Sequence, residues 1–226
     1  MAVIDAIRKA VLRTTGDKNT NEAFSSSQQV AAEMADLSNE VAAEIVAYHP
    51  WRALTRIQNV GGAGEAYALP ADYSRMAGDI DDASTWFWGY TAFNDVNEYL
   101  RFKTGGFLLA GNGGWIMLGG ELQFYPAPTA GATYPYISSY YARSEEGEAK
   151  SEFTTDNDTF ILSERLLTLG LVWRWKAQKG LEYAEDLASY DTAMAQESTR
   201  DRGSYVLRAP VSRFSAPIAY SGRAIR

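Results

Sequence analysis

His49 is the only imidazole in a chain of 226 residues that contains no cysteine. A Ser-His-Asp triad would have to use this side chain, and hydrolytic zinc sites need at least two His or Cys ligands. His49 stands between Tyr48 and Pro50, at the expected end of a helix, where the negative end of the helix dipole favours a cation. We therefore interpret it as a helix-terminal residue and expect no metal site and no cofactor.

Three glycine-rich stretches have the composition of phosphate-binding loops but lack their pattern. They are residues 61–64, 105–106 and 111–114. None leads into Lys-Ser or Lys-Thr at a helix start, and none has the Gly-x-Gly-x-x-Gly spacing after a strand. We interpret all three as turns in a β-rich region.

Asp156-Asn157-Asp158 resembles the beginning of a calcium-binding loop. The later glycine and the glutamate at the twelfth position are missing, and a helical pattern follows at once. We therefore expect a capping role, with a helix beginning at Asp158-Thr159.

Acidic and aromatic side chains in the middle of the chain leave one enzymatic alternative open. A glycosidase needs only two carboxylates at the right separation, and the sequence does not give that separation. The candidate carboxylates are Asp79, Asp81, Asp82, Glu145, Glu146, Glu148 and Glu152. Trp86, Phe87, Trp88 and Tyr90 could form a platform for sugar stacking, although alternation along a strand would bury half of them. The default expectation is solvated surface for the acids and core for the aromatic residues.

The charge distribution separates residues 200–226 from the rest of the chain. This segment has six arginines and one acid, a charge of +5, whereas residues 1–199 have 15 basic and 27 acidic side chains, a charge of −12. Such asymmetry is typical of a segment that binds a partner of opposite charge, which could be nucleic acid, an acidic protein surface or a neighbouring copy. Prolines exclude one continuous helix, and interspersed apolar residues favour ordering on binding. The predicted docking residues are Arg200, Arg202, Arg208, Arg213, Phe214, Arg223 and Arg226.

Helical periodicity occupies both ends of the chain. Apolar residues three or four apart predict helices over residues 3–13 and from residues 25–27 to Pro50, the second opened by a capping box of Ser25 with Gln28 or Ser26 with Gln29. Trp51 is expected to fill the core at the helix end. The pattern returns between residues 162 and 194, as two helices or as one helix bent at Gly180.

The middle of the chain predicts short strands separated by turns. Residues 65–69, 115–118, 121–125 and 136–142 fit strands, and Gly119-Gly120 fits a two-residue hairpin turn. A single helix is expected over residues 93–102, with Val96, Tyr99 and Leu100 facing inward.

The predicted fold class is α+β, a helical bundle with a β-rich insertion and an extended C-terminal tail. The expected boundaries are 1–60 and 146–199 for the bundle, 61–145 for the insertion and 200–226 for the tail. No window of about 18 apolar residues is present, so we expect no membrane-spanning helix.

Several stretches of the chain, taken in order, resemble one known family. Residues 50–52 are Pro-Trp-Arg, and residues 67–73 contain a Leu-Pro-x-Asp-aromatic turn after an expected strand. Residues 122–128, followed by 136–141, give an apolar strand, a proline turn and a tyrosine-rich strand, and residues 169–185 resemble paired helices. In this order they are similar to the head–tail adaptors of tailed bacteriophages, which bind directly below the portal.

The resemblance implies a non-enzymatic structural protein of the virion neck, made in the host bacterial cytoplasm. It implies a ring that matches a twelve-fold portal, extends the DNA channel, and supports tail or nozzle proteins, with the basic segment docked on the portal protein. An acidic channel would let genomic double-stranded DNA slide without sequence-specific binding. Two alternatives remain: a phage-encoded carbohydrate-binding or peptidoglycan-hydrolysing protein, and a nucleic-acid binder that uses the arginine-rich tail.

Overall fold

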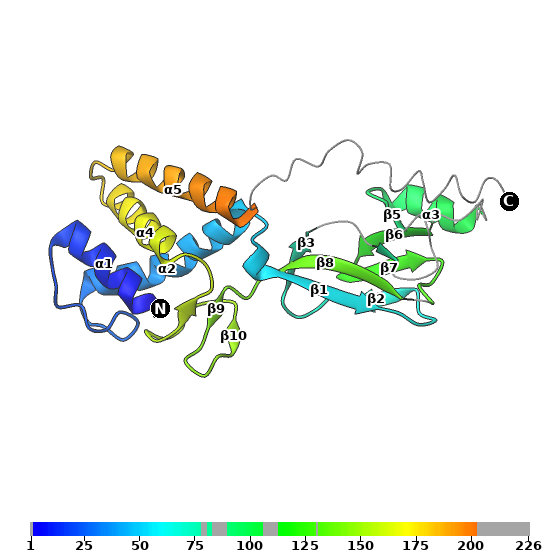
Figure 1. Cartoon of the computed structure of the whole chain (residues 1–226), viewed down its shortest axis with the longest axis horizontal. Helices are drawn as coiled ribbons and strands as arrows, with labels where there is room; N and C mark the ends of the chain where they lie inside the picture. Colours follow the sequence, from blue (N-terminus) through cyan, green and yellow to red (C-terminus); the bar gives the residue numbers. More distant parts are fainter. Residues whose placement is uncertain (1, 78–80, 83–89, 106–112, 130, 203–226) are drawn as a thin grey trace, which may run out of the picture.

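The computed structural model describes residues 2–77, 81–82, 90–105, 113–129 and 131–202. Most of the helices gather at one end of an elongated molecule, and most of the strands, together with α3, lie at the other (Figure 1). The fold is therefore α+β, as the sequence predicts. None of the described helices combines the length and the apolar composition needed to cross a membrane.

Four helices form the bundle: α1 (Val3–Thr15), α2 (Gln29–Tyr48), α4 (Glu164–Gln178) and α5 (Ala184–Arg202). Helix α4 packs against the other three, and its buried side chains lie in one apolar core with those of α1 and α2. Gly170 permits this close packing, since a Cβ atom there would lie 2.3 Å from Val41 Cγ1 on α2 and 3.2 Å from Tyr190 Cε2 on α5.

The predicted end of α2 is confirmed, but its predicted start is wrong. The helix ends at Tyr48, two residues before Pro50. It begins at Gln29, after an N-cap residue, Gln28, whose side chain makes no capping hydrogen bond. The Ser26 hydroxyl instead accepts a hydrogen bond from the Gln28 amide at 3.1 Å, so the serines shape the turn before the helix.

The start predicted for the third bundle helix is also wrong. Thr159–Phe160 is the short strand β11, and α4 begins after Ser163. Of the two possibilities at Gly180, the structure has two separate helices. Gly180 adopts a φ of 67°, and the Leu181 amide donates to the Lys176 carbonyl at 2.9 Å, which closes the end of α4.

The β region consists of two sheets. In the first, β8 (Ala132–Ser138) lies between β1 (Thr55–Val60) and β3 (Tyr73–Met76) and also pairs with β4 (Asp81–Asp82). In the second, the order is β2 (Ala66–Ala68), β7 (Glu121–Tyr125), β6 (Gly113–Leu118) and β5 (Tyr90–Ala92). The predicted hairpin is confirmed, because β6 and β7 are antiparallel around Gly119 and Gly120, whose φ angles are 61° and 82°.

Two parts of the β region differ from the sequence prediction. Strand β1 has no predicted counterpart, because its burial is irregular and Ile57 is 70% exposed. Helix α3 (Val96–Thr104) buries Tyr99 as expected, but Val96 and Leu100 are 41% and 47% exposed, so their predicted inward orientation is wrong. The short helix packs on β6 through one narrow face that carries Tyr99 and Phe102. The ring of Phe93, which precedes the helix, contacts both of these rings.

A third, small sheet places a hairpin beside the bundle. Strand β9 (Ala142–Arg143) pairs with both β10 (Ala149–Lys150) and β11 (Thr159–Phe160). In Figure 1 the β9–β10 hairpin extends below the bundle, while α5 runs along the top.

Candidate docking site

The chain passes from the bundle into the β region through a tightly packed corner after Pro50. Trp51 is 4% exposed, and its indole N–H donates to the Ile45 carbonyl at 2.7 Å. The prediction that this tryptophan fills the core at the end of α2 is confirmed. The guanidinium of Arg75, on β3, donates to the carbonyls of Val46 and His49 at 3.2 Å each. These contacts satisfy carbonyl groups that the end of α2 leaves free.

His49 connects the end of α2 to the end of α5. Its ring is buried, lies edge-on against Trp51, and places Nε2 3.1 Å from Oδ2 of Asp201. The two residues are 152 positions apart in sequence. This agrees with the interpretation of His49 as a helix-terminal residue. Sequence reasoning missed its acidic partner, because no local pattern announces a contact of that separation.

The last turn of α5 is held by a second partner. The backbone amide of Arg52 donates to the same Asp201 oxygen at 3.1 Å, and the Arg52 guanidinium donates to the Arg202 carbonyl at 2.5 Å. We call His49, Arg52, Asp201 and Arg202 the tail root. The tail root thus fixes Asp201 and Arg202, at the end of α5, to the corner of the bundle.

Of the predicted docking residues, the structure places two. Arg200 and Arg202 lie in the last turn of α5. The Arg200 side chain is 77% exposed and lies 3.1 Å from Glu197, one turn earlier, an ion pair of a kind that contributes about 0.3–0.5 kcal/mol to stability. The remaining predicted residues lie outside the described part of the chain: Arg208, Arg213, Phe214, Arg223 and Arg226.

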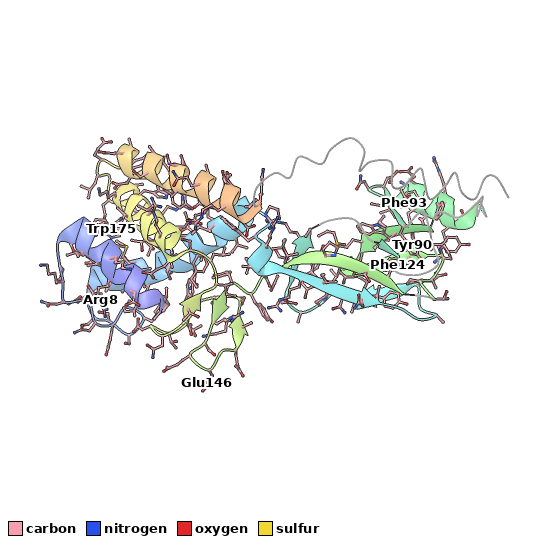
Figure 2. The ribbon with its side chains drawn as sticks, viewed as in Figure 1. Arg8, Tyr90, Phe93, Phe124, Glu146 and Trp175 are labelled. Atoms are coloured by element: carbon pink, nitrogen blue, oxygen red, sulfur yellow. The ribbon has the colours of Figure 1, made fainter. Side chains whose placement is uncertain are left out.

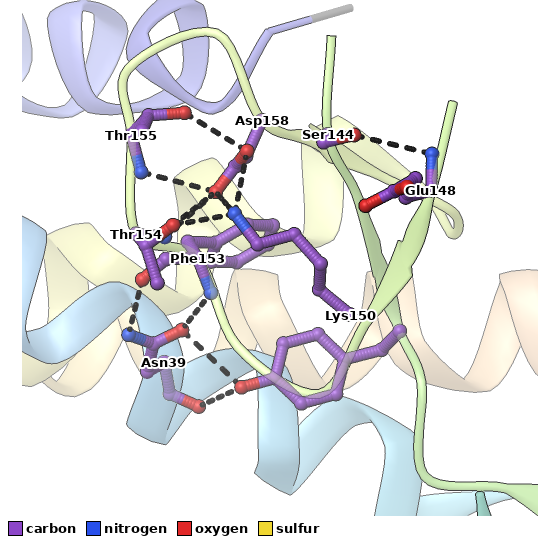
Figure 3. Close-up of polar contacts among 9 residues, drawn as sticks. Asn39, Ser144, Glu148, Lys150, Phe153, Thr154, Thr155 and Asp158 are labelled. Atoms are coloured by element: carbon purple, nitrogen blue, oxygen red, sulfur yellow. Dashed lines mark hydrogen bonds and ion pairs between the residues drawn. The ribbon is translucent and has the colours of Figure 1, made fainter. Parts of the chain in front are cut away.

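Asp158 is a buried carboxylate that organises the loop behind the β9–β10 hairpin (Figure 3). It accepts hydrogen bonds from Lys150 Nζ at 2.8 and 3.0 Å, from the amides of Thr154 and Thr155, and from the Thr155 hydroxyl. Burial alone raises the pKa of a carboxyl group, but here Lys150 and the amide donors outweigh it and lower the pKa of Asp158 to about 2. The carboxylate is therefore charged at neutral pH.

The same loop is attached to both N-terminal helices. The Asn39 amide group, on α2, accepts from the Phe153 N–H at 2.7 Å and donates to the Phe153 carbonyl at 3.1 Å. Asp156 accepts from the amides of Ala23 and Phe24, between α1 and α2. The predicted capping role of residues 156–158 is thus wrong, because their carboxylates hold loop backbone and a lysine. Within the described ranges, no three His, Asp or Glu side chains gather in a way that could hold a metal ion.

The residues considered for sugar chemistry divide into core, surface and undescribed positions. Tyr90 is buried, donates to the Pro126 carbonyl at 3.1 Å and packs edge-on against Phe124, so it belongs to the core. The exposed glutamates at 145, 146, 148 and 152 belong to the β9–β10 hairpin and its continuation. Asp79, Trp86, Phe87 and Trp88 lie outside the described residues.

The Leu-Pro-x-Asp-aromatic turn has a structural role, because its Asp72 contacts residues of the neighbouring strands. Its carboxylate accepts from the Tyr136 hydroxyl at 2.8 Å and lies 3.2 Å from Nε of Arg56, while its carbonyl accepts from the Ser139 amide at 2.7 Å. The turn thereby joins all three strands β1, β3 and β8 at the end of the sheet nearest the bundle (Figure 1).

Comparison with known proteins gives one family-level match that covers nearly the whole chain. A family model described as SU10 adaptor protein matches residues 1–216. The matched range includes the bundle, all three described β sheets and the tail root. A comparison with curated proteins gave no match.

Proposed function

We propose a head-to-tail connector function for this chain, which belongs to the SU10 adaptor protein family. The family match supports the general role of a structural adaptor of a bacteriophage. Our proposal adds that copies of the chain form a ring below the portal, twelve for a twelve-fold portal. The ring extends the DNA channel and supports the tail or nozzle proteins.

The tail root is the observation that carries the proposal. It fixes the end of α5 on the bundle, and 24 further residues follow with four arginines and no acid. Fully extended, 24 residues span about 80–85 Å, enough to reach a neighbouring ring in a stacked assembly. A basic, partly apolar segment that starts from a rigid point is suited to docking on the portal protein, because the bundle then keeps a defined position relative to the docked segment.

The acidic body suits a channel for DNA. Residues 1–199 carry −12, and an acidic lumen repels phosphates, so the genome slides rather than adheres. This part of the proposal requires that exposed carboxylates face the lumen of the assembled ring. A map of the ring with its acids on the outer surface would contradict it.

The test compares the full chain with a truncation after Arg202, each mixed with the cognate portal and imaged by electron microscopy. This end point keeps Arg200, Asp201 and Arg202, which belong to α5 and the tail root, so the bundle stays intact. We expect the full chain to cap the portal as a closed ring and the truncated chain to leave it uncapped. Failure of the full chain to associate at any salt concentration would refute the proposal.

A further inference from the structure

A basic groove crosses the bundle between α1, α4 and α5. It encloses about 570 Å³, and its charged lining consists of Lys9 and Arg13 from α1 and Glu164 and Arg165 from α4. Lys9 already lies 2.5 Å from Glu164. Arg13 and Arg165 are exposed and form no ion pair within the described part of the chain. As far as the described residues go, the groove thus offers two guanidinium groups without an ion-pair partner, in a body whose net charge is strongly negative.

The β9–β10 hairpin carries the opposite charge on a well-fixed turn. Glu145, Glu146 and Glu148 are all exposed, and the last two carboxylates have no hydrogen-bond partner among the described residues. Figure 2 shows Glu146 pointing away from the bundle. The turn itself is rigid, because Ser144 exchanges backbone hydrogen bonds with Glu148 and Gly147, and its hydroxyl accepts from the Glu148 amide.

The hairpin cannot fill the groove of its own chain. It extends from the lower side of the bundle in Figure 1, whereas the groove reaches Ser189 on α5, which runs along the top. Two different surfaces of one molecule that complement each other generate a head-to-tail contact between copies, and such a contact produces a ring when the rotation from one copy to the next closes. Charge complementarity therefore makes the hairpin of a second copy the candidate occupant of the groove.

We propose that the occupant of the groove is the hairpin tip of a second copy of this chain, with Glu146 and Glu148 paired to Arg13 and Arg165. Guanidinium groups bind carboxylates through two parallel hydrogen bonds, which favours arginine for such a contact. The inference rests on the proposed adaptor function, in which it supplies the contact between neighbours in the ring. Exposed ion pairs are screened over about 10 Å at 0.1 M salt, so the free chain should associate weakly and more strongly at low salt.

Charge reversal tests the contact directly. The variants are Glu146→Lys/Glu148→Lys in the hairpin and Arg13→Glu/Arg165→Glu in the groove, with one chain that combines all four changes. A matched control is Glu98→Lys/Glu121→Lys, which reverses two exposed glutamates in the β region. Self-association is measured by sedimentation at 50 mM salt, and ring formation by electron microscopy on the portal. Thermal unfolding followed by circular dichroism verifies that each variant folds.

We expect each double reversal to weaken self-association at least tenfold and to prevent closed rings, while the combined chain and the control associate like the wild type. Equal loss in the combined chain, or no loss in either double reversal, overturns the inference. A short DNA duplex and inorganic phosphate are added as probes. If Arg13→Glu/Arg165→Glu abolishes binding of either probe while self-association is unchanged, the groove is an anion site and the inference is overturned.

The two proposals fail in distinguishable ways. If the wild type caps the portal but the reversals have no effect on self-association, the adaptor function stands and the hairpin contact does not. If the reversals change self-association as expected but the wild type never binds the portal, the contact stands and the adaptor function does not.

Discussion

Replacement of Asp158 by asparagine should remove a substantial share of the stability of this protein. The carboxylate is buried and accepts six hydrogen bonds, two of them from the Lys150 ammonium group. Its pKa falls from the usual 3.8 to about 2, and each pKa unit corresponds to about 1.4 kcal/mol, so its ionisation contributes roughly 2–3 kcal/mol. Asparagine also leaves Lys150 without its counter-charge, a further cost. We expect a loss of about 2–4 kcal/mol in the free energy of unfolding at pH 7.

The pH dependence gives this prediction a second, independent measurement. Because the folded-state pKa of Asp158 is lowered, its contribution is fully present above about pH 4 and is lost as the pH falls toward 2. Other carboxyl groups titrate in the same range, so the relevant quantity is the difference between the wild type and Asp158→Asn. That difference should be largest at neutral pH and shrink steadily between pH 4 and pH 2.

Urea unfolding followed by far-ultraviolet circular dichroism, at several pH values, measures both quantities. Glu146→Gln is the matched control, because it removes a carboxylate from the same hairpin region at an exposed position that has no partner among the described residues. The control should lie within about 0.5 kcal/mol of the wild type. An Asp158→Asn variant as stable as the wild type at pH 7, or a difference that does not depend on pH, would refute the role assigned to this carboxylate.

Further substitutions test the packing of the bundle, the β core and the tail root. Gly170→Ala should lower the unfolding free energy by about 1–2 kcal/mol through overpacking against Val41, with Val41→Ala restoring part of it in urea titrations. Tyr134→Phe removes a buried hydroxyl without a partner among the described residues and should raise the unfolding free energy by up to about 1 kcal/mol. Tyr136→Phe removes a hydrogen bond to Asp72 and should lower the unfolding free energy by about 1 kcal/mol. Equal effects of the two substitutions in urea titrations would contradict this assignment. His49→Ala should expose the tail root, so trypsin should cleave after Arg200 and Arg202 faster than in a Tyr48→Ala control, as measured by mass spectrometry.

Local rules predicted the elements whose boundaries depend on neighbouring residues. Pro50 ends α2, and Gly119-Gly120 turns the β6–β7 hairpin, since both effects arise from the backbone of the residues themselves. The same rules failed at Asp158, which has the type and position of an N-cap residue. The Asp158 carboxylate accepts hydrogen bonds from Lys150 and from the amides of Thr154 and Thr155 instead of from helix amides. These donors are also close in sequence, but they reach the carboxylate only because the loop folds back on the bundle. A capping pattern in the sequence does not indicate which of the two sets of donors the carboxylate binds.

The sequence predicted the charge of the candidate docking segment but not the contacts around it, because charge depends on composition and contacts depend on the fold. Charge is additive along a chain, so the contrast between residues 1–199 and 200–226 is visible in the sequence. Contact is not additive: the sequence identifies His49 as a helix end but cannot indicate that Asp201 lies beside it. Nor can it indicate that Arg13 and Arg165, from different helices, line one groove.

The position of the unpaired charges is consistent with assembly. Asp158, with Lys150, and His49, with Asp201, are charged or polar pairs that hold the hairpin and the end of α5 in place. The carboxylates of the hairpin tip belong to the hairpin that the pair of Asp158 and Lys150 holds against its loop. In the contact that we propose between copies, the repulsion between like charges within the groove and within the hairpin tip is relieved when the two surfaces meet. In that contact the pair of Asp158 and Lys150 holds the hairpin in position, and the exterior charges select the surfaces that associate.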